Sequence, residues 1–130
     1  MWQEYNPNPI QSRIVGDCSV RAISKALDVP WEKAYMMLCS NGFAMGDLPS
    51  SNATIASVLR QHGFYRDVID NECPDCYTIA DFCKDNPEGV YVLGTGNHVA
   101  TVVDGVLYDA WNSENEIPQY VFFKQEEEKK

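Results

Sequence analysis

Cys18 stands where a cysteine could act as a nucleophile. It directly follows Asp17, a residue type that often caps helices, and Val20, Ile23 and Leu27 recur after it at helical spacing. The start of a helix supplies partial positive charge and unpaired N–H groups, which lower the pKa of a thiol. The pattern therefore predicts a helix that begins at Cys18 and carries a reactive thiol in its first turn.

A histidine and an aspartate flank a predicted β-hairpin in the second half of the chain. The apolar runs 99–103 and 106–108 are separated by Asp104-Gly105, a pair that strongly favours a two-residue turn of the primed type. In that register His98 and Asp109 point to the same side of the hairpin, with backbones roughly 7–8 Å apart on the diagonal. We expect their side chains to reach each other.

These residue types together can carry out nucleophilic catalysis. Cys18 would attack a carbonyl group, His98 would exchange its proton, and Asp109 would orient the imidazole and stabilise its charged form. The N–H groups of the first helical turn could hold the oxyanion that forms, and Gln11 upstream is a candidate second donor. Trp111 could shield the pair from water.

Two segments carry a resemblance to a known family. Residues 16–23 (GDCSVRAI) and 97–109 (NHVATVVDGVLYD) resemble the papain-like cysteine peptidases, closest to small bacterial and phage forms and similar to bacteriocin-processing peptidase domains. The order Gln, Cys, His, Asp matches that of the family. The resemblance implies a papain-like fold in which the cysteine opens the first helix, the histidine lies on a sheet strand and the aspartate follows on the next strand.

The chemistry and the resemblance predict a metal-independent and cofactor-free hydrolase. It would cleave a peptide or protein amide through a thioester on Cys18. A related alternative is an acyltransferase of transglutaminase type, because transfer to an amine begins with the same acyl-enzyme. A non-enzymatic alternative is an acidic binding or inhibitor protein that has the papain fold and an inactive triad.

The remaining cysteines allow two other kinds of site. Cys73-Pro74-Asp75-Cys76 could be a redox pair or half of a zinc site, with Cys83 and His62 as further ligands. The acidic residues before the motif would raise the thiol pKa values, and the spacings match no strong zinc motif. We therefore expect two reduced thiols in a surface loop, and no disulfide framework in a chain with five cysteines.

The periodicity predicts four helices followed by a sheet. The first helix starts at Cys18, the second extends from Pro30 to about Gly42, the third follows Ser51-Asn52, and the fourth covers 78–84. The stripe of the second helix should pack in the core: Trp31, Ala34, Tyr35 and Leu38. Strands are expected at 90–93, 99–103, 106–108 and 120–123, and an extended loop before Cys18. This is an α+β class, with N-terminal helices packed on a C-terminal antiparallel β-sheet.

Composition limits the wider interpretation. The chain has 130 residues, a net charge of −9 and 45% hydrophobic residues, which predicts a single domain over 1–124 and a charged, disordered tail at 125–130. The negative charge disfavours nucleic acid as a partner. The longest apolar runs are too short to cross a membrane, and the N-terminus lacks the pattern of a secretory signal. We expect a cytoplasmic monomer.

Overall fold

The computed structural model describes residues 1–10, 15–70 and 76–124, and over these it is an α+β structure with four helices and six strands. The predicted tail at 125–130 lies outside the described residues. The helices are α1 (Cys18–Leu27), α2 (Trp31–Met45), α3 (Asn52–Gln61) and α4 (Ile79–Asp85). The strands are β1 (Trp2–Glu4), β2 (Phe64–Val68), β3 (Val90–Gly94), β4 (Val99–Val103), β5 (Val106–Asp109) and β6 (Tyr120–Lys124).

All six strands of the described chain form one sheet with the order β1-β5-β4-β3-β6-β2. The β4–β5 hairpin has the predicted register, with Val103 opposite Val106. Both turn residues have positive φ, 51° at Asp104 and 78° at Gly105, which is the geometry of a primed turn. The backbone of this hairpin therefore follows directly from its Asp-Gly pair, and it sets how His98 and Asp109 approach each other.

Two strands were not expected from the sequence. The predicted loop before Cys18 is wrong at its start, because Trp2–Glu4 pairs with β5 in parallel, so the sheet is not wholly antiparallel. The segment Phe64–Val68 pairs antiparallel with β6, although only Phe64 among its residues is buried. Neither segment has the alternation of a half-buried strand, and their backbone pairing with distant strands creates them.

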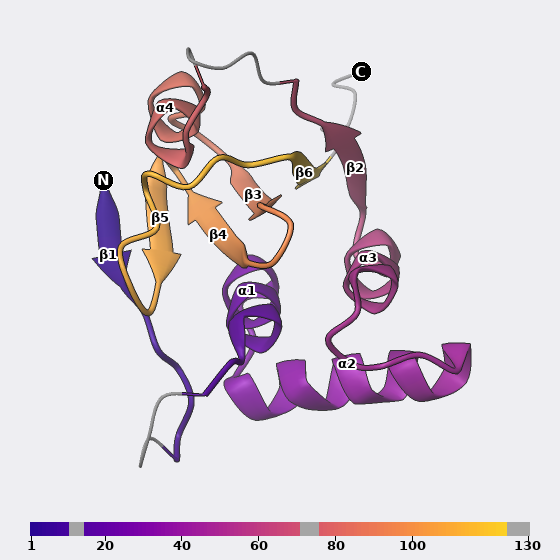
Figure 1. The fold of residues 1–130 in the computed structure, drawn as a ribbon. Coiled ribbons are helices and arrows are strands. Elements are labelled where there is room, and N and C mark those ends of the chain that lie inside the picture. Colours follow the sequence, from indigo (N-terminus) through magenta and orange to yellow (C-terminus); the bar gives the residue numbers. More distant parts are fainter. Residues whose placement is uncertain (11–14, 71–75, 125–130) are drawn as a thin grey trace, which may run out of the picture.

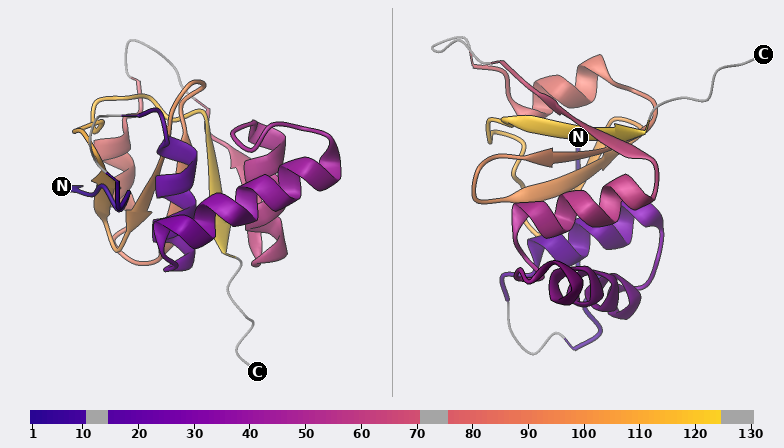
Figure 2. Two further views of the ribbon diagram at one scale, coloured as in Figure 1. Left: turned by 90° about the horizontal axis from the view of Figure 1, so that it is seen from below. Right: turned by 90° about the vertical axis from the view of Figure 1, so that its right-hand side faces the viewer.

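The sheet is covered on both faces (Figures 1 and 2). Helices α1, α2 and α3 lie on one face, and α4 lies on the other. The alternation along β3 matches this arrangement, since Val92 packs in the cluster with α1–α3 while Leu93 packs in the cluster with α4. Strand β6 repeats the pattern, with Phe122 facing α1–α3 and Val121 facing α4. The sheet therefore holds α1 at a fixed position against the hairpin.

The helix boundaries confirm most of the predicted signals and correct others. Ser51 caps α3 with its side chain, as predicted. The fourth helix extends over Ile79–Asp85 rather than 78–84, because Thr78 is its N-cap and not its first residue. Pro30 is the N-cap of α2 rather than its first helical residue, and α2 continues beyond Gly42 to Met45. Within the described parts of the chain, no helix has both the length and the apolar character needed to span a membrane.

The predicted core stripe of α2 is wrong at one position. Leu38 and Ala34 are buried, and Trp31 packs against the core, but Tyr35 is 46% exposed. Its ring instead lies beside the Trp31 ring, with centroids 5.1 Å apart. Helical spacing identifies which residues share a face but not how far the facing elements extend over it.

Gly94 at the end of β3 provides a test of the packing beneath the site. A Cβ added there would lie 2.0 Å from the ring of Tyr120, its partner on β6. We expect Gly94→Ala to lower the free energy of unfolding by about 1–3 kcal/mol, because the Tyr120 ring must move out of a packed position. Urea denaturation measures this. Gly16→Ala is the control, since a Cβ there meets nothing within 4 Å; equal stability of the two variants would contradict the described packing.

Candidate active site

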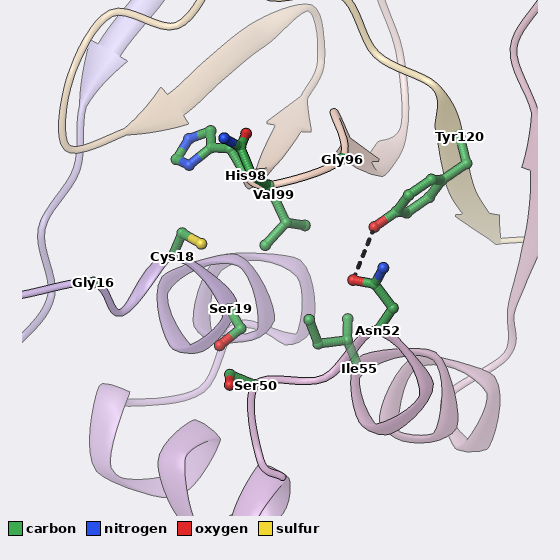
Figure 3. A pocket seen from close by; sticks show the side chains of 11 residues that line it. Gly16, Cys18, Ser19, Ser50, Asn52, Ile55, Gly96, His98, Val99 and Tyr120 are labelled. Carbon is green, nitrogen blue, oxygen red and sulfur yellow. Dashed lines mark hydrogen bonds between the residues drawn. The ribbon is translucent and has the colours of Figure 1, made fainter. Parts of the chain in front are cut away.

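The first turn of α1 presents the Cys18 thiol at the edge of a cavity of about 160 Å³. The side chain is partly buried and lies below the His98 ring in Figure 3. The first intrahelical hydrogen bond runs from the Arg21 N–H to the Asp17 carbonyl at 2.9 Å, so the N–H groups of Cys18 and Ser19 precede the helical ladder. The predicted helix start and the position of the thiol on it are both present.

His98 and Asp109 lie in direct contact. Nε2 of His98 is 2.6 Å from Oδ2 of Asp109, and the His98 and Asp109 side chains are 11% and 1% exposed. Cys18, His98 and Val99 line the same cavity. Because Nε2 is taken by Asp109, Nδ1 is the ring nitrogen that remains for the thiol. The structure therefore brings Cys18, His98 and Asp109 together in the order that nucleophilic catalysis requires.

Four groups from different parts of the chain fix the Asp109 carboxylate. Besides His98, the Ser113 hydroxyl donates to Oδ2 at 2.7 Å. The backbone N–H of Ala110 and the Arg21 guanidinium donate to Oδ1, at 2.8 Å and 3.1 Å. A carboxylate with this many donors stays charged and keeps one orientation, so it can hold the imidazole in one tautomer and one plane.

The pKa values of the pair shift in opposite directions. Burial alone would raise the pKa of the Cys18 thiol, but hydrogen bonds from His98 and the Val99 backbone, with the charges of His98 and Arg21, bring it below its ordinary value. Burial alone would lower the pKa of His98, but its hydrogen bonds to Asp109 and Cys18 raise it to about 9. A lowered thiol pKa beside a raised imidazole pKa favours a thiolate–imidazolium pair near neutral pH.

The other two predicted site residues differ in what can be said of them. The ring of Trp111 lies against that of His98, with centroids 4.9 Å apart, and is itself 46% exposed. It covers one side of the imidazole from solvent. Gln11, the candidate oxyanion donor, lies outside the described residues.

Sequence reasoning missed how Asp17 acts. It stands at the N-cap of α1, but its side chain makes no capping hydrogen bond. Its carboxylate instead pairs with Arg21 one turn later and accepts a hydrogen bond from Nε1 of Trp31 at 2.9 Å. The i, i+4 spacing of Asp17 and Arg21 was a visible signal for that pair.

No spacing pattern in the sequence indicated Ser113 or the residues that line the cavity across from Cys18. The Tyr120 hydroxyl of β6 donates to Oδ1 of Asn52 on α3 at 3.3 Å, and both residues line the cavity across from Cys18 (Figure 3). They come from elements that are distant in the chain. Only the folded arrangement places them near the thiol.

Two other described cysteines lie on other helices than Cys18. Cys39 is partly buried on α2, and Cys83 is buried on α4, where burial raises the pKa of its thiol. Cys76 takes part in a disulfide bond, so the prediction of two reduced thiols is wrong at this position, and Cys73 lies outside the described residues. Over residues 1–10, 15–70 and 76–124, no group of three or more His, Cys, Asp or Glu side chains could hold a metal ion.

The comparisons with known proteins identify no relative. The chain has no significant match among protein-family models, curated proteins or solved structures. The chemistry of this site is therefore inferred from the geometry of Cys18, His98 and Asp109.

Proposed function

We propose that the chain is a cysteine-nucleophile hydrolase of papain-like type that cleaves a peptide or another amide bond. One observation carries the proposal. Cys18 and His98 line the same cavity, and Nε2 of His98 lies 2.6 Å from Oδ2 of Asp109. A thiol, an imidazole and a carboxylate in this order form the constellation that activates a cysteine nucleophile.

In the proposed reaction, Cys18 and His98 act first in forming the acyl-enzyme and then again in its hydrolysis. The Cys18 thiolate attacks the carbonyl carbon while the imidazolium of His98 holds the displaced thiol proton. The N–H groups at the start of α1 stabilise the tetrahedral oxyanion. Collapse of that intermediate breaks the C–N bond, and the leaving amine takes the proton from His98. A thioester remains on Cys18.

Hydrolysis of the thioester completes the cycle. His98, now neutral, removes a proton from water as the hydroxide attacks the thioester carbonyl. The carbon–sulfur bond breaks, a carboxylic acid leaves, and the thiolate–imidazolium pair re-forms. Asp109 keeps its charge throughout and stabilises the imidazolium in both halves. An amine in place of water would give the transfer reaction instead.

Selective alkylation tests whether the nucleophile is activated. Under limiting iodoacetamide, we expect Cys18 to label at least about tenfold faster than Cys39 at pH 7, because the pKa of the Cys18 thiol is lowered and the thiolate is the reactive form. Its pH midpoint should lie below the ordinary thiol value, whereas Cys83 should label late at every pH because it is buried and its thiol pKa is raised. Mass-spectrometric peptide mapping over pH 5–10 measures all three.

Trapping of the acyl-enzyme tests the reaction itself. A p-nitrophenyl ester should add one acyl mass to the wild-type chain, the adduct should be released by hydroxylamine as a thioester is, and Cys18→Ala should not form it. Product formation with and without an added amine then distinguishes hydrolysis from transfer. Equal labelling of Cys18 and Cys39 together with the absence of an adduct would overturn the proposal in favour of a binding protein.

A further inference from the structure

Arg21 joins the nucleophile-bearing helix to the carboxylate of the triad. Its Nη1 pairs with Oδ1 of Asp17, the residue directly before Cys18, and its Nη2 lies 3.1 Å from Oδ1 of Asp109. The Arg21 side chain is only 8% exposed, and the Asp17 and Asp109 side chains are 9% and 1% exposed. One guanidinium therefore spans from the first turn of α1 to the end of β5.

Burying Arg21 with two carboxylates costs free energy of folding, so a role in stability alone does not explain it. Burial removes hydration from three charged side chains, and ion pairing recovers this only with good geometry. Among the described residues, Nε of Arg21 is buried and has no acceptor. The two ion pairs that Arg21 makes within the described chain involve the residue directly before Cys18 and the carboxylate that contacts His98.

We propose that Arg21 is a positioning residue that clamps the start of α1 to Asp109 and so sets the approach of Cys18 to His98. The inference rests on the proposed function, since it assigns a role within the same site. The two catalytic side chains belong to different layers, Cys18 to α1 and His98 to the β4 end of the sheet. Among the described residues, Arg21 is the one side chain with ion pairs to both the residue before Cys18 and the carboxylate that orients His98.

Arg21 also balances the charges that face the thiol. The titratable and charged groups of the described chain around Cys18 are His98 before β4, Asp109 on β5, Tyr120 on β6, and Asp17 and Arg21 beside it in the chain. Removing the guanidinium would leave two carboxylates without their shared cation. Both negative charges would then disfavour the Cys18 thiolate.

The test compares the pH dependence of Cys18 alkylation in four proteins: wild type, Arg21→Gln, Arg21→Lys and Asp17→Asn/Arg21→Gln. We expect Arg21→Gln to move the midpoint upward by roughly one pH unit. The double variant should recover at least half of that shift, because it removes one of the uncovered carboxylates. Arg21→Lys should keep the wild-type midpoint but reach a lower maximal rate, because an ammonium cannot span both carboxylates in a fixed fork.

A purely structural role would not produce this pattern. Loss of stability lowers the folded fraction, which circular dichroism measures, but does not move the midpoint of the molecules that remain folded. Unchanged midpoint and maximal rate in Arg21→Gln would overturn the inference while leaving the proposed function intact. If Arg21→Gln does not fold, Arg21→Lys provides the test. A pH profile of Cys18 alkylation in Arg21→Lys with the wild-type midpoint and maximal rate would overturn the inference. Equal labelling of Cys18 and Cys39 in the wild type, together with the absence of an acyl adduct, would instead overturn the proposed function.

Discussion

Replacing His98 by alanine should lower the rate of p-nitrophenyl ester turnover by at least about 100-fold, because general acid–base catalysis contributes roughly that much or more. Burial raises the pKa of the Cys18 thiol, and the hydrogen bonding and charge of the imidazole act against that rise. Without it, only the Val99 backbone and the Arg21 charge oppose the effect of burial, which raises the thiol pKa. The alkylation midpoint of Cys18 should therefore move upward, and its lead over Cys39 at pH 7 should vanish. Stopped-flow absorbance and peptide mapping measure the two effects.

The second histidine of the chain is a matched control for this experiment. His62 follows α3, and its Nδ1 lies 2.9 Å from the carbonyl oxygen of Val58, away from the cavity that Cys18 lines. His62→Ala should leave both turnover and the Cys18 midpoint unchanged. Equal turnover in His98→Ala and the wild type would exclude His98 as the general base.

Replacing Asp109 by alanine should have the largest effect on stability. The change leaves His98 and Arg21 buried beside an empty position and removes the acceptor of the Ser113 hydroxyl. Breaking a buried charge pair by removing one partner costs about 3–5 kcal/mol in free energy of unfolding. The pKa of His98 should also fall from its raised value of about 9, because burial would then act without the carboxylate. Urea denaturation measures the first effect and NMR titration of the histidine the second.

Asp109→Asn separates the effect of the charge on stability from that of the hydrogen bonds, and Asp67→Ala is its control. Asp109→Asn keeps the shape and the hydrogen-bonding capacity but not the charge, so it should retain more stability than alanine while still lowering the pKa of His98. Asp67→Ala is the control for loss of a carboxylate, because Asp67 is exposed on β2 and, within the described part of the chain, its side chain accepts only from the N–H of Val68. A loss below about 1 kcal/mol in Asp109→Ala would contradict the described charge network.

The local half of the site could be predicted because its signals are short-range. The helix that begins at Cys18 follows from the spacing of Val20 and Ile23. The hairpin register follows from Asp104-Gly105, since few residue pairs tolerate two successive positive φ angles. Together these two elements predicted that the thiol starts a helix and that His98 and Asp109 share one hairpin.

The short edge strands could not be predicted in the same way. Trp2–Glu4 becomes a strand because its backbone pairs with β5. The indole N–H of Trp2 also donates a hydrogen bond to the backbone carbonyl of Asp109 at 3.1 Å. Three residues carry too little periodicity to indicate such a partner. The sequence also did not show how much of each helix the rest of the fold covers. Tyr35 shares the apolar face of α2, yet it is exposed.

By itself, then, the sequence determined which residues could react and the two local elements that carry them, because helix starts and tight turns depend on neighbouring residues. Only the tertiary structure decided that the thiol meets the imidazole, and that Arg21 links Asp17 to Asp109 behind them. The contact between Arg21 and Asp109 joins residues that are 88 positions apart in the chain. Their geometry depends on how α1 packs against the sheet, and a linear pattern of residue types does not contain that information.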